Sequence, residues 1–479
     1  MRLRHLAACL AIGLVMSLAG ACGGGYGGGG GMGSGGGYGA SPPPSVAFTA
    51  PAQAMSINLG QAVKLAWTAS NATSCTASAS SATAGSFSGS QPATGQTSVV
   101  PTAMGNVTYT LSCSGAGGMQ SATTQTLTVN PSILSQLASV APSAIGSTID
   151  PIEQGGNPYG LALAPASAGL VSAGDLLVCN FNDGATNSQG KGTTLVGLHP
   201  SAGAQPYRIA QSGSLEGCNA LAALADGTIA AAAITSNQVP LVSTSGALTT
   251  PFAADGFAAP WGITYVAASG GKSAALYVAD LGGSIDRIEL NGDAQSSFTT
   301  IASGFCGSGS PGAIFAPAGL TYDPSIDTLY IVDTSSNSVV AFTNVTAIAA
   351  NGIVVDGQCN TVAAPPTPAP TFSGPAAASA RVIAHGGPFI APISAALLAD
   401  GDLIVTNGDV NIGSGQMANL AVEVSPVLPG GFVGEPIQLD TSGTPGALFG
   451  VVATVDAQGH QIVYFNDDNT NTVMKLAAP

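Results

Sequence analysis

One unit of sequence recurs six times in residues 140–479, and this repetition constrains the fold more than any other feature. Each copy has a Pro-x-Gly type of start, an apolar run ending in Asp or Asn, and a further apolar run, as in Pro260-Trp261-Gly262, Leu276–Asp280 and Ile285–Ile288. Short apolar runs between turns indicate strands, and such repeats pack as propeller blades. The copies begin at Pro158, Cys218, Pro260, Pro317, Pro392 and Leu448. They predict an all-β fold with a six-bladed β-propeller.

The sixth copy is short of one strand. Its third apolar run, Thr472–Leu476, is followed only by residues up to Pro479, so no segment after it forms an outer strand. The segment Ile145–Ile152, which precedes the first copy, is placed to supply that strand. We therefore expect the two ends of the propeller to pair, which removes an exposed sheet edge.

The repeat resembles two known groups of propellers. The Pro-x-Gly starts, with second runs that end in Val-Ala-Asp280 and Ile-Val-Asp333, resemble NHL-repeat propellers. The second resemblance is to the gluconolactonase and senescence-marker group, which are metal-dependent lactone hydrolases. In that group a Glu precedes the first Pro and polar residues follow later ones, and together they hold a divalent cation. Here Asn157 precedes Pro158, and the residues after the prolines are Tyr159, Trp261, Ala318 and Ile393. The resemblance therefore implies no cation cage.

Seven residues are candidates for a binding rim. Five of them end the second strand of a blade, and two are aromatic residues beside the starting glycines: Asn180, Asp280, Asp333, Asn407 and Asn466, and Tyr159 and Trp261. A ring of oxygens suits Ca²⁺ or a polyol, and aromatic rings stack on a sugar or a peptide. The alternatives are that the polar residues cap turns and that the aromatic residues pack between blades. Ca²⁺ is the one cofactor considered, and none is otherwise expected.

No catalytic residue is predicted. Three histidines follow the predicted signal peptide of residues 1–21, namely His199, His385 and His460. None of them lies in a Gly-x-Ser-x-Gly or a His-Glu-x-x-His sequence. The sequence therefore favours a binding protein over an enzyme.

Residues 45–130 are predicted to form a small β-sandwich. Alternating runs are separated by Gly, Pro, Asn and Ser turns. Leu65-x-Trp67, a turn before Cys75, and Tyr109-x-Leu111-x-Cys113 resemble bacterial immunoglobulin-like modules. We expect Trp67 to pack near a Cys75–Cys113 disulfide that joins the two sheets. The function of this domain is adhesion to carbohydrate or protein, or that of a spacer, and the spacer is favoured.

The first 44 residues carry export signals. Arg2 and Arg4, an apolar stretch and Ala19-Gly20-Ala21 form a signal peptide over residues 1–21. Cys22 follows, in a context that resembles a bacterial lipobox with its leucine one step early, at Leu18. Lipidation of Cys22 is expected, and the alternative is plain cleavage that leaves a free thiol. Residues 22–44 are a Gly/Pro-rich tether. An aspartate directly after the lipidated cysteine would resemble an inner-membrane retention signal. Gly23 stands at that position here, so we expect a lipoprotein of the outer membrane.

Cysteine number and charge support an extracytoplasmic protein. Eight cysteines, less Cys9 and Cys22, leave six, which pair in sequence order as Cys75–Cys113, Cys179–Cys218 and Cys306–Cys359. Nine basic residues against 24 acidic ones give a net charge of −15, and the basic residues are scattered, which excludes nucleic acid as a partner. The predicted function is an envelope-anchored lipoprotein that binds protein or glycan through a propeller rim. The alternative is a metal-dependent hydrolase of the gluconolactonase-like type.

Overall fold

The computed structural model describes residues 40–249, 252, 256–292, 294–310, 313–357, 368–408, 417–442 and 444–478. The predicted signal peptide, Cys22 and Cys359 lie outside the described residues, so lipidation and the third cysteine pair stay predictions. Among the described residues, no helix combines the length and the apolar character needed to cross a membrane.

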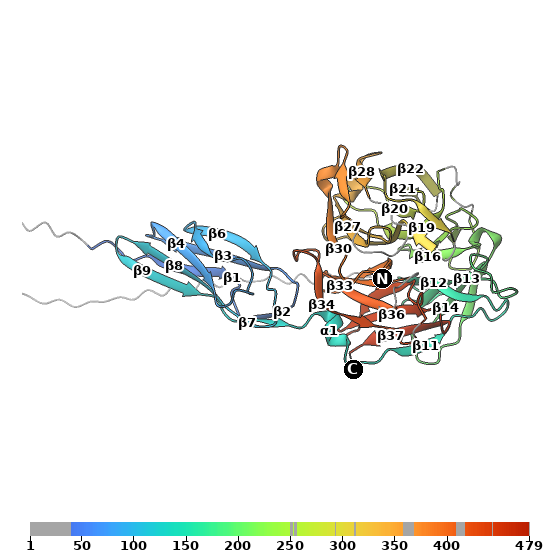
Figure 1. The fold of residues 1–479 in the computed structure, drawn as a ribbon, viewed down its shortest axis with the longest axis horizontal. Helices are drawn as coiled ribbons and strands as arrows, with labels where there is room; N and C mark the ends of the chain where they lie inside the picture. The colour runs from blue at the N-terminus through green and yellow to red at the C-terminus, as the bar shows by residue number, and fades with distance from the viewer. Residues whose placement is uncertain are drawn as a thin grey trace, which may run out of the picture. The chain divides into compact units, whose positions relative to one another are not determined.

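Residues 45–130 form three small sheets around one core (Figure 1). The first sheet contains β1 (Ser45–Ala50), β3 (Val63–Ser70) and β6 (Thr94–Val99). The second contains β2 (Met55–Asn58), β10 (Leu127–Asn130) and β7 (Gly105–Val107). The third contains β5 (Gly89–Gln91), β4 (Ser74–Ala79), β8 (Tyr109–Gly115) and β9 (Gly118–Thr123). The expected sandwich packing is present, and its kinship with immunoglobulin-like modules stays a prediction.

The Cys75–Cys113 disulfide forms as expected, but not between sheets. Cys75 lies directly opposite Cys113 on the adjacent antiparallel strands β4 and β8, with the two Cα atoms 4.0 Å apart. The prediction of a bridge between two sheets is therefore wrong, because strand neighbours and facing sheets both bring cysteines together at this spacing. Trp67 comes from a different sheet, is buried in the same core, and packs edge-on against Phe87.

Six further sheets form the propeller. Blades one and two follow one another along the chain, and within the described residues the sheet of blade two has three strands. Blade one contains β12 (Gly156–Leu163), β13 (Leu176–Asn182), β14 (Thr194–Leu198) and β15 (Tyr207–Gln211). Blade two contains β16 (Cys218–Ala223), β17 (Ile229–Ala233) and β18 (Leu241–Val242), and the 3-10 helix η1 (Gly213–Leu215) precedes it.

Blades three and four are joined by a long insertion within blade four. Blade three contains β19 (Pro260–Val266), β20 (Ala275–Asp280), β21 (Ser284–Asn291) and β22 (Ala294–Ser303). Blade four contains β25 (Pro317–Asp323), β26 (Thr328–Asp333), β27 (Ser338–Thr343) and β30 (Ala380–His385). The segment between β27 and β30 carries η2 (Val345–Ala347), β28 (Ile353–Asp356), β29 (Thr371–Ser373) and η3 (Ala377–Ser379). Strand β28 pairs in parallel with β22, so the insertion of blade four extends the sheet of blade three. A short hairpin of β23 (Ser308–Ser310) and β24 (Ala313–Phe315) precedes blade four.

The last two blades complete the ring. Blade five contains β31 (Pro392–Leu397), β32 (Leu403–Asn407), β33 (Leu420–Val424) and β34 (Phe432–Gln438). Blade six contains β35 (Val451–Val455), β36 (Gln461–Asp467), β37 (Thr472–Ala477) and β11 (Ser143–Ser147). Strand β11 is the outer strand, antiparallel to β37, with Ser147 opposite Thr472. The expectation that a segment before the first copy completes the last blade is confirmed.

The innermost strands touch in sequence: β12 contacts β16, and so on through β19, β25, β31 and β35, which contacts β12 again. The glycine of the Pro-x-Gly start lies where these strands approach most closely. A side chain on Gly262 would overlap the carbonyl oxygen of Ala318 in the next blade, and one on Gly319 would lie 2.7 Å from the carbonyl oxygen of Ile393. The glycine therefore recurs because neighbouring backbones leave no room for a Cβ atom.

The close approach of Gly262 to the next blade predicts that adding one methyl group at this position strongly destabilises the propeller. Gly262→Ala is expected to destabilise the propeller by about 3 kcal/mol, because the rigid backbone of Ala318 cannot move away cheaply. Unfolding is followed by fluorescence in a Trp67→Phe background, where Trp261 is the single remaining tryptophan and reports on the propeller. Gly213→Ala is the control, since a Cβ there meets no atom within 4 Å. Equal stability of the two variants would contradict the steric explanation.

Candidate functional site: the central cavity of the propeller

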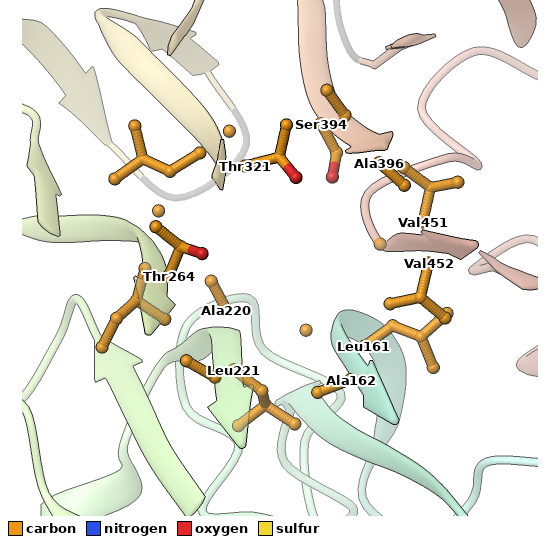
Figure 2. Close-up of a pocket in the computed structure, with 18 of the residues that line it drawn as sticks. Leu161, Ala162, Ala220, Leu221, Thr264, Thr321, Ser394, Ala396, Val451 and Val452 are labelled. Carbon is orange, nitrogen blue, oxygen red and sulfur yellow. The ribbon is translucent and has the colours of Figure 1, made fainter. Parts of the chain in front are cut away.

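The inner strands of all six blades surround a cavity of about 360 Å³. Figure 2 shows this cavity encircled by side chains from successive blades, including Leu161, Leu221, Thr264, Thr321 and Val452. The size falls within the range of sites that hold a small molecule or one inserted side chain. The lining strands present small side chains toward the cavity, among them those of Ala162, Ala220 and Ala396, and these leave the middle of the ring open.

Aromatic rings form one end of the cavity. Tyr159 is stacked between Phe181 and Phe449, with ring centroids 4.1 Å and 3.7 Å away, and Trp261 meets Tyr159 edge-on at 6.0 Å. Tyr159 and Trp261 are only 2% and 4% exposed. These two predicted rim residues therefore pack between blades, as the alternative interpretation had it, and present little surface for stacking on a ligand.

Most side chains that line the cavity are apolar, and the polar ones are those of Tyr159, Asn219, Thr264, Tyr265, Thr321 and Ser394. Three of these carry aliphatic hydroxyl groups. Thr264, Thr321 and Ser394 come from the adjacent blades three, four and five, and Figure 2 shows their oxygens directed toward the cavity. Within the described part of the chain, none of these hydroxyls makes a hydrogen bond to a protein atom. A ligand in the cavity therefore meets three hydrogen-bonding groups that the fold itself does not use.

No carboxylate or imidazole lines this cavity among the described residues. Its ionisable groups are the phenols of Tyr159 and Tyr265. Burial, and then the negative charge of Asp226, raise the pKa of Tyr265 above its ordinary value. This phenol is therefore protonated near neutral pH, and a protonated phenol is no general base.

The five polar rim candidates are buried and held within the fold. Asp280 is 1% exposed and accepts hydrogen bonds from the backbone N–H groups of Ala258, Ala259 and Gly282, at 2.9, 3.0 and 2.6 Å. Asp333 is also 1% exposed and accepts from Ser335 and Ser336. Burial raises the pKa of Asp333, and these hydrogen bonds oppose the rise.

The three asparagines behave in the same way. Asn180 donates to the carbonyl oxygen of Thr148 at 2.9 Å, Asn407 donates to that of Pro388 at 2.8 Å, and Asn466 donates to that of Tyr159 at 3.1 Å. All three side chains are buried. The geometry is that of caps on neighbouring turns and strands, and ligand contact through these residues stays a prediction.

The Cys179–Cys218 disulfide is present, as predicted. It joins β13 of blade one to the start of β16 in blade two, and the Cα atoms are 5.6 Å apart. The bond links blade two covalently to blade one. The sequence position of both cysteines at one rim was enough to predict it.

The sequence gives no sign of one ordered histidine. The pairing of Leu176 with Leu198 in the β13–β14 hairpin brings Asp175 next to His199, and the Nδ1–Oδ1 distance is 2.6 Å. Tyr207 donates to the other oxygen of Asp175 at 2.6 Å. The side chain of Asp175 is 1% exposed and that of His199 is 60% exposed. This imidazole lies at the surface just after β14, and the residues lining the cavity do not include it.

The described residues therefore form an all-β protein with a six-bladed β-propeller. The comparison with solved structures found distant similarities. A catalytically inactive virginiamycin B lyase from Staphylococcus aureus, solved with quinupristin, aligns over 68% of this chain and 97% of its own, at 13% identity and a TM-score of 0.40. A gluconolactonase from Xanthomonas campestris aligns over 68% of this chain and 87% of its own, at 14% identity and a TM-score of 0.43. Likenesses this distant do not transfer an activity. No protein-family model and no curated protein matches the chain.

The cap geometry at the rim predicts a stability effect. Asp280→Ala is expected to cost on the order of 3 kcal/mol, because it leaves three backbone N–H groups near a buried position without their acceptor. The measurement is the free energy of unfolding of the propeller from Trp261 fluorescence. Asp356→Ala, at an exposed position of β28, serves as the control and is expected to change it by less than about 0.5 kcal/mol. If Asp280→Ala leaves the free energy of unfolding unchanged, the explanation that this carboxylate stabilises the fold as a cap is wrong.

Proposed function

We propose that the chain is a non-catalytic binding protein of the bacterial envelope, whose propeller takes an apolar segment of a protein ligand into its central cavity. The observation that carries this proposal is the cavity itself. Most of its side chains are apolar, three hydroxyls have no partner in the described chain, and the described lining contains no acid or base apart from two phenols.

The lining favours binding over hydrolysis. A metal-dependent hydrolase of the propeller type needs several oxygen ligands at the channel to hold a hard cation. The residues that line this cavity offer small aliphatic side chains, aromatic rings, hydroxyls and the amide of Asn219. That amide is already used, because Ile234 donates to its oxygen and its nitrogen donates to Trp261. The predicted alternative of a lactone hydrolase therefore has no donor set in this cavity.

The same lining favours a peptide over a glycan. Sugar sites present exposed aromatic faces and many polar side chains, whereas the rings of Tyr159 and Trp261 are covered by their neighbours. An apolar side chain gains free energy by entering a space walled by Leu, Val and Ala, at about 25 cal/mol per Å² of buried apolar surface. Backbone amides of such a segment are suitable partners for Thr264, Thr321 and Ser394. The proposed site is thus the cavity, and not the rim.

The proposal includes presentation at the outer membrane. Lipidation of Cys22, the glycine-rich tether and the spacer role of residues 45–130 rest on the sequence, which supports a body held away from a bilayer. Two disulfides among the described cysteines accord with an oxidising compartment.

The test is a random peptide library displayed on phage and selected against the purified chain. Selection is expected to enrich peptides with a shared apolar residue. Thr321→Trp is expected to weaken their binding by more than about tenfold, because it fills the cavity and removes one hydroxyl. Gln295→Trp, on the exposed outer strand of blade three, is the matched control and should leave binding unchanged.

Two results would contradict the proposal. Selected peptides that bind the Thr321→Trp variant as tightly as the original chain would place the site elsewhere. If a glycan binds the chain on an array and does not bind the Thr321→Trp variant, the cavity is still the site but the proposed peptide ligand is wrong.

A further inference from the structure

Three carboxylates gather in blade five, apart from the central cavity. Asp400 and Asp402 lie in the turn before β32, and Glu423 lies in the neighbouring strand β33. One oxygen from each of the three lies within 4.8 Å of the others. The residues come together because Leu403 pairs with Val424, which puts Asp402 and Glu423 on the same face of the sheet.

Two of these carboxylates are buried. Glu423 is fully buried and accepts hydrogen bonds from the backbone N–H groups of Ile133 and Leu134, at 3.1 and 2.6 Å, at the start of the short helix α1 (Ile133–Leu137). Asp402 is 2% exposed, and its Oδ2 atom is buried without any hydrogen-bond partner. Burying a carboxylate oxygen without a hydrogen-bond partner costs free energy. A ligand bound to this atom would offset that cost.

No basic side chain balances this group. Among the described residues, none of the three carboxylates forms an ion pair with Lys, Arg or His. The charged groups that act on Asp402 are Asp400 and Glu423, which are acidic themselves. Burial, and then these charges, raise the pKa of Asp402 to about 8, and burial raises the pKa of Glu423 to about 7. Within the described chain, the fold therefore supplies this group with no positive charge.

We propose that Asp400, Asp402 and Glu423 bind one divalent hard cation of the Ca²⁺ class. Ca²⁺ prefers carboxylate oxygens at about 2.3–2.6 Å, so two oxygens of one shell lie at most about 5 Å apart. The 4.8 Å spacing of the three oxygens fits this limit. The free Oδ2 of Asp402 is the principal ligand, and the oxygens of Asp400 and Glu423 have lone pairs beyond their present hydrogen bonds.

The ion has a way in from solvent. Asp400 is half-buried and lines a separate surface cavity of about 400 Å³ together with Ile133, Leu137 and His460. His460 is the titratable group nearest this entrance from blade six, and its Nδ1 atom already pairs with Asp456 at 3.1 Å. Water in this cavity completes the coordination shell, as is usual for Ca²⁺ sites.

Binding there has a structural effect. Glu423 holds the first turn of α1, and α1 packs with Ile133, Leu134 and Leu137 on the core shared by blades five and six. A cation that keeps Glu423 ionised strengthens its hydrogen bonds to α1. The ion therefore fixes the segment that leads from residues 45–130 into the propeller.

The experiment is calorimetric titration of the purified full chain with CaCl₂ after treatment with EDTA. Uptake of a single ion is expected, and Asp402→Asn is expected to weaken it by more than about tenfold. Asp402→Asn should remain folded without metal, as judged by near-UV circular dichroism, because it replaces a carboxyl group that is costly to ionise. Asp356→Asn is the control with the same chemical change at an exposed position, and should bind Ca²⁺ like the original chain.

Two outcomes would overturn the proposal. The chain takes up no Ca²⁺ in the titration, or it takes up Ca²⁺ equally in the Asp402→Asn variant. None of these readouts depends on the peptide selection proposed for the central cavity.

Discussion

The close approach of the six inner strands determines most of what this molecule presents. Because Gly262 and Gly319 lie against the backbone of the following blade, the ring is as narrow as glycine allows. That width sets the size of the cavity and brings rings from separate blades into one aromatic cluster. A wider ring would have a hydrated channel, and a narrower one would have no cavity. The central cavity and its aromatic end are consequences of this one steric limit.

The features predicted well from the sequence are those with a local signal. Six blades and the closing strand followed from the Pro-x-Gly starts and the apolar runs, because hydrophobic periodicity reports directly on strands. The pairing of Cys179 with Cys218 followed from their position at one rim. The Cys75–Cys113 bridge was predicted as a pair but misplaced between sheets, because cysteine spacing does not distinguish a neighbouring strand from a facing sheet.

The features missed depend on distant contacts. Burial of Asp280 is set by the loop that carries Ala258 and Ala259, which no pattern around Asp280 reveals. The acidic group of blade five had one signal in the sequence: Glu423 interrupts the apolar run Leu420–Val424, where a charge is out of place in a fully buried strand. Its significance appears only when strand register places Asp402 beside it.

The insertion of blade four has a consequence for how the propeller comes apart. In most repeat arrays each unit contacts its sequence neighbours through side chains, and units can open one at a time. Here β28 leaves blade four and joins the sheet of blade three through backbone hydrogen bonds. Opening either blade exposes backbone groups of the other, so we expect the two blades to open together in amide hydrogen exchange.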